Sequence, residues 1–403
     1  MVFYGLALAF CLCLTGCSEK NVPLGPVSSP AQGAAPEAAE HGFGELISWD
    51  EFYRKNAAAA LKTVREMPRL QKLSQLFLIN LEGKGRFTPA EYDGDNSPLI
   101  PGGYLFFSYN IGGDGGEVRD FTASIGDYCR EQGLIPPFLA LDHEGGLVNR
   151  LRAFNPLPSA REVSQSLSPD QAWELYRDQG KLLASLGFHL NLAPVAEAET
   201  AENAVFLKNR SYGDAAAVSV YARRAVEGYR AGGIQTALKH FPASTNADPH
   251  TSLPELALGL TELERTSVKP FQALLASGPA AVLMAHTRTS LDPDVPACLS
   301  RYWVTAVLRE RFAFTGLIIS DDIYMAALEK NGYPPAQAVE QAVDAGIDVI
   351  MLSEKRFLPA LCVLADRAAL DPDFARRIDQ AAARILAFKR YCGITLPREF
   401  AGL

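Results

Sequence analysis

The sequence lacks several features that would assign a function at once. Basic residues form no cluster, and 38 Lys and Arg are outnumbered by 46 Asp and Glu, which gives a net charge of −8. Such a charge disfavours nucleic acids and anionic membrane surfaces as main partners. Phosphate-loop spacings such as GxGxxG and GKS/T are missing, as is the zinc motif HExxH. We therefore expect no nucleic-acid partner.

Cysteine is also sparse. Three of the seven cysteines fall within the first 17 residues. The other four are Cys129, Cys298, Cys362 and Cys392. They are widely scattered without a CxxC pair, which is more typical of lone buried thiols than of a disulfide framework. A disulfide bond could form if the protein is exported, but the spacing of the cysteines does not show which of them would pair.

The first 17 residues, MVFYGLALAFCLCLTGC, are apolar, too short for a comfortable membrane span, and end in small residues. This pattern is typical of a signal peptide. Its end, Leu14-Thr-Gly-Cys17, resembles a bacterial lipobox, in which Cys17 receives a lipid; an ordinary signal peptide and a misassigned start codon are the alternatives. Residues 18–44, rich in Pro, Ala, Gly and Glu, predict a flexible tether. We expect an exported protein, lipid-anchored to the bacterial cell envelope.

Eight short apolar runs recur along the rest of the chain. They lie at 76–80, 103–108, 138–142, 189–194, 236–240, 282–286, 317–321 and 348–353. Runs that are apolar on both faces, separated by stretches long enough for a helix, are typical of parallel strands in a βα series. Eight such units predict an α/β fold, a closed (β/α)8 TIM-type barrel. We expect a single catalytic domain over residues 45–395, and a monomer.

Polar residues end several of these runs. They include Asp142, Lys239, His240, His286 and Asp321. In a (β/α)8 barrel the C-terminal strand ends meet and build the active site. Some polar residue is expected at the end of any strand. That explains a Ser or an Asn, but it explains two His, a Lys and two Asp less well. We therefore predict an active site at that end of the barrel, called the mouth below.

Two carboxylates, Asp321 and Asp322, follow the seventh run. Because successive strand residues face opposite sides, only one of the two is expected to face the mouth. A carboxylate there can serve as a nucleophile, a base, a metal ligand or a hydrogen-bond acceptor. An Asp after a strand is also a common helix N-cap, so the motif alone is weak.

The loop after the fifth run contains Asp248-Pro-His250. An Asp at this spacing can reach the imidazole and fix its tautomer, so the pair could act as a general acid/base. Two residues that merely cap turns are the structural alternative. A metal site formed by His240, Asp248 and His250 is a further alternative, which no HExxH or cysteine pair supports.

A longer motif follows the third run. Its glycine pair, Gly145-Gly146, is expected to let the backbone approach a ligand closely. The motif begins at Asp142 and ends at Arg150, and Arg210 lies in the loop after the fourth run. Both arginines are therefore expected at the mouth.

Five motifs occur in one order with matching separations. They are Asp142-x-Glu-Gly-Gly-x-Val-x-Arg150, Asn209-Arg-Ser-Tyr-Gly213, Lys239-His-Phe-Pro242, Asp248-x-His250 and Ile319-Ser-Asp-Asp322. Together they resemble glycoside hydrolase family 3, in particular its single-domain bacterial β-N-acetylhexosaminidases, over about residues 65–390. The resemblance implies a (β/α)8 barrel and a retaining mechanism without a metal or an organic cofactor.

The resemblance also implies roles for individual residues. Asp321 would be the nucleophile that carries the glycosyl-enzyme intermediate, and His250 the general acid/base, oriented by Asp248. The residues expected to bind N-acetylglucosamine are Asp142, Arg150, Arg210, Lys239 and His240. The expected activity is that of a retaining exo-β-N-acetylglucosaminidase acting on cell-wall fragments or related β-GlcNAc glycans.

The chain departs from the family pattern near the acid/base loop. Lys-His-Phe-Pro is usually followed by Gly-His-Gly, but residues 243–245 are Ala-Ser-Thr. Pro249 occupies the middle of the Asp-x-His motif, Glu197 stands where the family has Asp, and His143 replaces the commoner Gln. All the proposed catalytic groups are retained.

Three alternatives stay open. A glycan-binding lipoprotein on the same barrel, without turnover, fits the loss of Gly-His-Gly but not the retention of Asp248, His250 and Asp321. A β-glucosidase of the same family is the second alternative. Transfer to phosphate instead of water is the third, because a His base does not repel phosphate as a carboxylate would.

Overall fold

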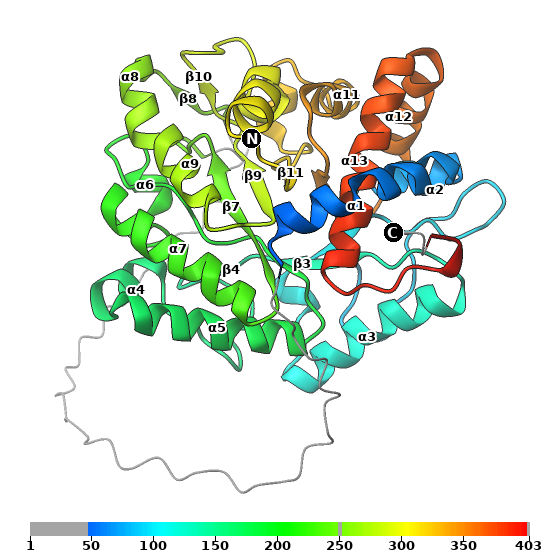
Figure 1. The fold of residues 1–403 in the computed structure, drawn as a ribbon, viewed down its shortest axis with the longest axis horizontal. Helices are drawn as coiled ribbons and strands as arrows, with labels where there is room; N and C mark the ends of the chain where they lie inside the picture. The colour runs from blue at the N-terminus through cyan, green and yellow to red at the C-terminus, as the bar shows by residue number, and fades with distance from the viewer. Residues whose placement is uncertain (1–46, 249–251, 401–403) are drawn as a thin grey trace, which may run out of the picture. The chain divides into compact units, whose positions relative to one another are not determined.

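Eight parallel strands form a barrel in the computed structural model, which describes residues 47–248 and 252–400 (Figure 1). The strands are β1 (Phe77–Asn80), β2 (Gly103–Phe106), β3 (Phe138–Leu141), β6 (Leu190–Asn191), β7 (Gln235–Phe241), β9 (Ala281–Met284), β11 (Leu317–Ile319) and β12 (Ile350–Leu352). Neighbours in the sheet follow chain order. A parallel bridge between Ile319 and Val349 joins the two edges and closes the barrel. Each predicted run overlaps one strand, so the predicted fold is confirmed.

Helices connect most of these strands and surround them (Figure 1). The α-helices are α1 (Trp49–Glu66), α2 (Arg69–Ser74), α3 (Gly115–Glu131), α4 (Ala160–Ser166), α5 (Pro169–Ser185), α6 (Ala204–Leu207), α7 (Ala215–Ala231), α8 (Leu260–Leu263), α9 (Lys269–Leu275), α10 (Ala326–Lys330), α11 (Pro335–Ala345), α12 (Leu358–Leu370) and α13 (Pro372–Tyr391). Further helical segments are η1 (Ser108–Asn110), η2 (Glu264–Val268), η3 (Ala297–Leu299), η4 (Tyr302–Arg311) and η5 (Arg398–Phe400). Two short pairs of strands lie outside the barrel: β4 (His143–Gly145) with β5 (Val148–Asn149), and β8 (Glu255–Leu256) with β10 (Arg288–Thr289).

The first connection differs from the predicted repeat. Residues 81–102, between β1 and β2, contain no helix. Four glycines and three prolines fall within these residues, and both residue types disfavour a helix interior. The first strand is instead preceded by α1 and α2.

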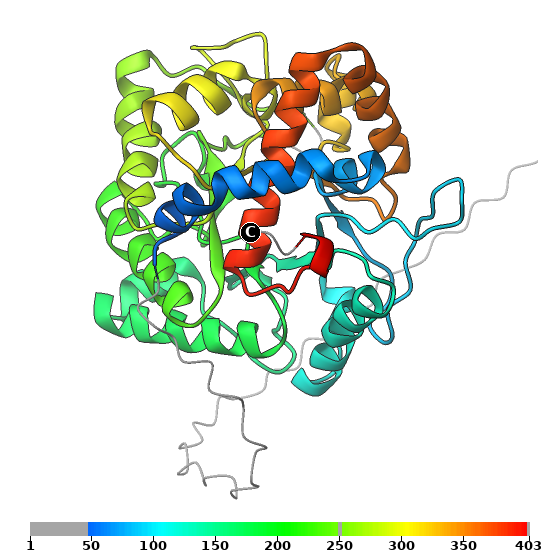
Figure 2. The ribbon, with the colours of Figure 1, turned by 45° about the vertical axis from the view of Figure 1, so that its right-hand side comes forward.

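One end of the barrel is covered by α1 and α13. Trp49 of α1 stacks on Tyr53 and meets the rings of Phe388 and Tyr391 in α13. Phe388 also contacts Phe138, the first residue of β3, so α13 lies at the N-terminal strand ends. Figure 2 shows α1 passing over α13. The C-terminal strand ends, where the site is predicted, are at the opposite end of the barrel.

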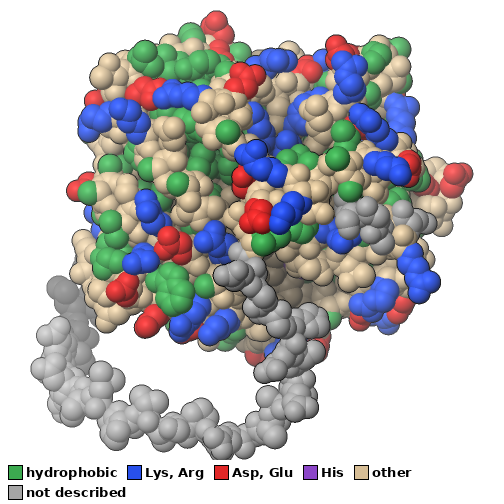
Figure 3. Space-filling model, viewed as in Figure 1, with side chains coloured by type: hydrophobic (Ala, Val, Ile, Leu, Met, Phe, Trp, Pro, Cys, Tyr) green, Lys and Arg blue, Asp and Glu red, His purple; other side chains and the backbone are tan. Residues whose placement is uncertain are grey.

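The surface carries charge of both signs. On the face shown in Figure 3, Lys and Arg side chains are interspersed with Asp and Glu instead of forming one basic stripe. Among the helices within residues 47–248 and 252–400, none combines the length and the apolar character needed to cross a membrane.

A buried ion cluster joins the N-terminal ends of β11 and β12. The Asp348 carboxylate is fully buried, accepts from the backbone N–H of Ile318 (2.9 Å), and contacts Arg309, Arg377 (3.0 Å) and Arg384 (2.5 Å). Burial by itself raises the pKa of Asp348, but the three guanidinium groups outweigh it and hold the pKa below its usual value. The ionised carboxylate therefore fastens η4, α13 and two strands together.

Replacing Asp348 with Asn should lower the free energy of unfolding by about 3–5 kcal/mol, because three arginines would lose their shared counter-charge in a buried site. Since the pKa of Asp348 is lowered by folding, its stabilisation is present above the unfolded-state pKa of about 3.9 and is lost as the pH falls below it. Urea unfolding at pH 7 measures the loss in the variant, and a second series from pH 4 down to pH 2.5 measures the pH dependence. The control is Asp344→Asn, at a partly exposed pair with Arg367, for which a loss below about 1 kcal/mol is expected. Equal losses in the two variants would contradict this account of the cluster.

Candidate active site

A buried ammonium lies at the centre of the mouth. The Nζ atom of Lys239 lies 2.6 Å from Asp142 Oδ1 and 2.7 Å from Glu144 Oε1, and its side chain is 3% exposed. Lys239 belongs to β7, Asp142 directly follows β3, and Glu144 lies in β4. A buried cation is stable only when paired, so these contacts hold the ends of β3 and β7 in one arrangement.

Two arginines extend this ion network. Arg210 donates two hydrogen bonds to Glu144, each 2.8 Å long, and Arg150 Nη2 lies 3.3 Å from Asp142 Oδ2. Burial by itself raises the pKa of both carboxyl groups. Lys239 and Arg210 outweigh burial at Glu144, and Lys239 and Arg150 do so at Asp142, so each pKa lies below its usual value. Both groups are therefore ionised acceptors at neutral pH.

The network brings together four of the predicted binding residues, Asp142, Arg150, Arg210 and Lys239. The fifth, His240, joins through its Nε2 atom, 3.5 Å from Arg210 Nη2. Glu144 was part of the recognised motif but was not predicted as a site residue. Its position two residues after Asp142, on the same side of an extended segment, could have indicated it. Alternating donors and acceptors of this kind suit a ligand rich in hydroxyl groups.

His240 is oriented by Glu197. His240 Nδ1 lies 2.8 Å from Glu197 Oε1, and Ser244 donates to Glu197 through its backbone N–H (2.5 Å) and its hydroxyl (2.9 Å). Burial by itself raises the pKa of Glu197, but the hydrogen bonds from His240 and Ser244 lower it below the usual value. The ionised carboxylate therefore keeps the proton on Nδ1 and turns Nε2 toward Arg210. Glu197 and Ser244, two departures from the family pattern, are in direct contact.

The two carboxylates after β11 differ in their surroundings. Asp322 is buried, and its carboxylate accepts from the backbone N–H of Tyr324 (3.0 Å) and Ser353 (2.9 Å). It thereby holds the loops after β11 and β12 together. Within the described part of the chain, the partly exposed Asp321 carboxylate accepts one hydrogen bond, from the backbone N–H of Asp322 (2.9 Å). Asp321 is thus the more exposed member of the pair, and its carboxylate is the one open to a ligand at the end of the strand.

His286 supports the loop after β11, in which Asp321 and Asp322 lie. Its Nε2 lies 3.0 Å from the Asp322 carbonyl oxygen, and its Nδ1 lies 3.1 Å from Cys298 Sγ. A carbonyl can only accept, so Nε2 carries the proton and Nδ1 accepts from the thiol. The ring is buried, and its position indicates support of the loop, not contact with a ligand.

The loop of the predicted acid/base pair is described in part. Asp248 is exposed, and its carbonyl accepts from the backbone N–H of Ser252 (3.0 Å). This hydrogen bond connects the two described residues that flank positions 249–251. His250 itself lies outside the described residues, so its predicted role stays a prediction.

The glycine pair has a structural role that differs from the predicted one. Gly145 and Gly146 connect β4 to β5 with φ values of 96° and 54°, a region that disfavours other residues. A Cβ at Gly145 would lie 2.1 Å from the Pro158 carbonyl oxygen. The close approach is therefore to the chain's own backbone. His143, beside this turn, is fully buried, and burial lowers its pKa to about 4, so the ring is neutral.

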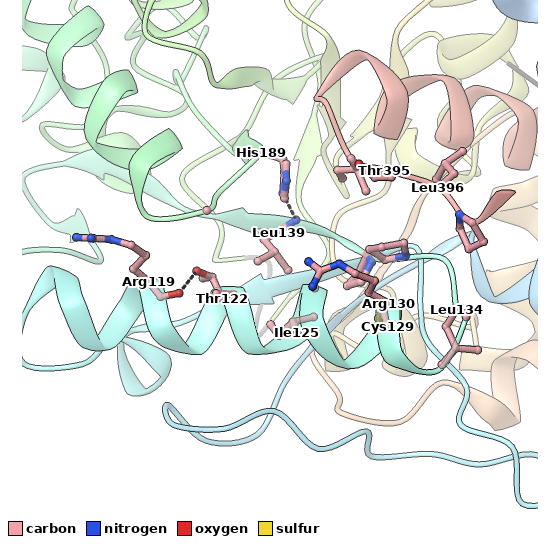
Figure 4. Close-up of a pocket in the computed structure, with 18 of the residues that line it drawn as sticks. Arg119, Thr122, Ile125, Cys129, Arg130, Leu134, Leu139, His189, Thr395 and Leu396 are labelled. Carbon is pink, nitrogen blue, oxygen red and sulfur yellow. Dashed lines mark hydrogen bonds between the residues drawn. The ribbon is translucent and has the colours of Figure 1, made fainter. Parts of the chain in front are cut away.

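A cavity of about 720 Å³ lies elsewhere, between α3 and the segment that follows α13 (Figure 4). Its lining is largely apolar and includes Cys129 and His189, whose Nδ1 accepts from the backbone N–H of Leu139 (3.0 Å). None of the predicted site residues that the structure describes lines this cavity. Residues 47–248 and 252–400 also contain no group of three His, Cys, Asp or Glu residues placed to hold a metal ion.

The chain is similar to known glycoside hydrolases. The family model described as "Glycosyl hydrolase family 3 N terminal domain" matches residues 115–388. A "Beta-hexosaminidase" of Xylella fastidiosa (strain 9a5c) is 35% identical over 262 residues, covering 62% of this chain and 76% of that protein. A "Beta-hexosaminidase" of Pseudomonas aeruginosa (strain LESB58) is 33% identical over 274 residues, covering 66% of this chain and 78% of that protein.

Two solved structures are similar in fold. The β-N-acetylhexosaminidase of Beutenbergia cavernae DSM 12333 has a TM-score of 0.70 and 28% identity, over 81% of this chain and 99% of that chain. The glycoside hydrolase family 3 β-N-acetylglucosaminidase of Paenibacillus sp. str. FPU-7 has a TM-score of 0.71 and 28% identity, over 81% of this chain but only 63% of that chain. The barrel, the ion network at its mouth and these similarities lead to one assignment: the chain belongs to glycoside hydrolase family 3 and is a glycoside hydrolase.

Proposed function

We propose that this chain is a retaining exo-β-N-acetylglucosaminidase that removes terminal β-linked N-acetylglucosamine from cell-wall fragments or related glycans. The observation that carries the proposal is the ion network around Lys239, at the same end of the barrel as Asp321. The names of the two hexosaminidase relatives support a hexosaminide substrate.

The network is suited to the non-reducing-end sugar. A sugar hydroxyl can donate to the Asp142 carboxylate while accepting from Lys239 or Arg150, and His240 Nε2 and Arg210 offer a second acceptor and donor. These side chains already hold one another in place, so sugar binding costs little side-chain entropy.

The proposed reaction has two steps. In the first, an Asp321 oxygen bonds to the anomeric carbon as the glycosidic bond breaks, and His250 gives its proton to the departing oxygen. In the second, water attacks the same carbon, its proton passes to His250, and the bond to Asp321 breaks. Each step inverts the configuration at the anomeric carbon, so the product retains the configuration of the substrate. Asp248 would hold the imidazole in the tautomer that both steps need.

The start of the altered segment before the acid/base pair is anchored to Glu197. Ser244 lies at the start of the segment that leads to Asp248, and the Glu197 carboxylate accepts both of its donors. Because Glu197 also orients His240, the start of this segment and the binding pocket share one buried carboxylate. We infer that the described start of this segment, from Ser244, keeps a defined position without the family's usual Gly-His-Gly.

The full-length protein should hydrolyse 4-nitrophenyl β-N-acetylglucosaminide faster than the matching β-glucoside. Asp321→Asn should lower kcat by at least about 1,000-fold, because no covalent intermediate can form. His250→Ala should lower it by about 100- to 10,000-fold through loss of the general acid/base. Release of 4-nitrophenol measures these rates, with the exposed Asp366→Asn on α12 as the control.

Each contrary result selects an alternative. A faster reaction on the glucoside would favour a β-glucosidase, and N-acetylglucosamine 1-phosphate formed in phosphate buffer would favour a phosphorylase. Binding of N-acetylglucosamine by calorimetry without turnover would favour the glycan-binding protein. Activity indifferent to His250→Ala would refute the dyad.

Glu197→Gln and Ser244→Ala should be energetically coupled. Each variant removes part of the same hydrogen-bonded group, so a double-mutant cycle in urea unfolding should give a coupling energy of about 0.5–3 kcal/mol. The control cycle pairs Ser244→Ala with Glu199→Gln, whose side chain bonds Arg161 instead, and should be additive within about 0.5 kcal/mol. Additivity in the first cycle would contradict the anchoring role of Glu197.

We propose that the enzyme is exported and anchored to the cell envelope by a lipid on Cys17, which lies outside the described residues. The support is the lipobox-like end of residues 1–17 and the composition of residues 18–44. In bacteria fed an alkyne-tagged fatty acid, the protein should be labelled and sediment with membranes. Cys17→Ser should lose the label and Cys13→Ser should keep it. A label that survives Cys17→Ser would exclude this anchor.

A further inference from the structure

A row of two aromatic rings between two cations leads away from Asp142. Arg150 lies 3.3 Å from Asp142, and its guanidinium carbon lies 5.0 Å from the centroid of the Phe107 ring. The rings of Phe107 and Tyr109 are parallel within 2°, with their centroids 5.8 Å apart. Lys355 Nζ then lies 5.9 Å from the Tyr109 centroid. Each member contacts the next, so Tyr109 belongs to the same wall of the mouth as Asp142.

The rings stand on a fixed support. Phe107 and Tyr109 follow β2 directly, at its C-terminal end. The fully buried Asn110 side chain accepts from the backbone N–H of Phe107 (3.0 Å) and donates to the carbonyls of Leu81 (3.1 Å) and Gly83 (2.7 Å). These bonds tie the turn to the segment after β1, which holds the aromatic residues in place without a ligand.

Tyr109 is nevertheless 51% exposed. Single exposed aromatic residues are common and often need no explanation. Here, however, the ring is parallel to a partner, lies on a braced turn and continues a line that begins at a proposed sugar ligand. An aromatic face attracts the weakly positive C–H groups of an apolar surface, such as one face of a pyranose ring.

We propose that Tyr109 forms the binding site for the second sugar of the substrate, the pyranose ring that leaves when the glycosidic bond breaks. This inference rests on the proposed function, which places the first sugar against Asp142 and its neighbours. The leaving sugar stacks on Tyr109 on the side where the exposed Lys355 side chain now lies, so Lys355 turns aside as this sugar binds. Lys355 and Glu82, an exposed ion pair at the end of the row, border its hydroxyl groups.

Two substrates separate this site from the rest of the pocket. N,N′-diacetylchitobiose has a pyranose leaving group, whereas N-acetylglucosaminyl β-fluoride has none. Tyr109→Ala should lower kcat/KM about tenfold on the disaccharide and leave the fluoride within about twofold. Tyr109→Phe keeps the ring and should retain disaccharide activity within about twofold. Tyr92→Ala, at another exposed tyrosine outside the row (40% exposed), is the control and should affect neither substrate.

The outcomes are distinct. An equal loss on both substrates, or no loss on either, would overturn the role of Tyr109 while the proposed function stands. If the parent protein cleaves neither substrate, the proposed function fails, and calorimetry tests the site by itself. Tyr109→Ala should then weaken binding of the disaccharide about tenfold and leave binding of N-acetylglucosamine unchanged; equal effects on both would overturn the inference.

Discussion

The arrangement of the mouth depends on one buried ammonium, that of Lys239. A cation in this position requires counter-charges, and Asp142 and Glu144 supply them at 2.6 and 2.7 Å. Without Lys239, these two carboxylates would repel each other across the end of β3. Each of them also holds an arginine: Glu144 holds Arg210, and Asp142 holds Arg150. Every charged group proposed to bind the first sugar is therefore placed directly or indirectly by Lys239.

The two ends of the barrel use buried charge for different purposes. At the N-terminal end, Asp348 is enclosed by three arginines, and α1 and α13 lie across the strands. At the C-terminal end, the network around Lys239 still has Asp142 and Arg150 at partial exposure, near 20%. The first cluster ties elements together, whereas the second presents donors and acceptors outward. This division is the one that (β/α)8 barrels generally follow.

The strands were predictable because each is apolar on both faces, a pattern that local sequence displays directly. The missing helix between β1 and β2 was also visible in principle, because residues 81–102 are rich in Gly and Pro. The glycine pair was harder, since its φ values say that glycine is needed but not whether a ligand or the chain itself approaches. The contacts of Lys239 were beyond local sequence, because it meets Asp142 across 97 positions. The barrel rule predicted that both residues lie at the mouth, and the resemblance to a family implied that both bind the same sugar, but neither gave the ion pair between them.

The contact between Glu197 and Ser244 shows why departures from a family pattern are better judged in pairs. Taken alone, Glu197 for Asp adds a methylene to a buried side chain, and Ser244 for His replaces an imidazole with a smaller hydroxyl near the acid/base loop. Together they form a closed set, because the Glu197 carboxylate accepts both Ser244 donors while still holding His240 Nδ1. A hydroxyl buried without an acceptor would cost about 1–3 kcal/mol, so the serine requires an acceptor within reach, which Glu197 provides. The two changed residues thus hold His240 in one orientation, which favours retained catalysis over a barrel that only binds glycan.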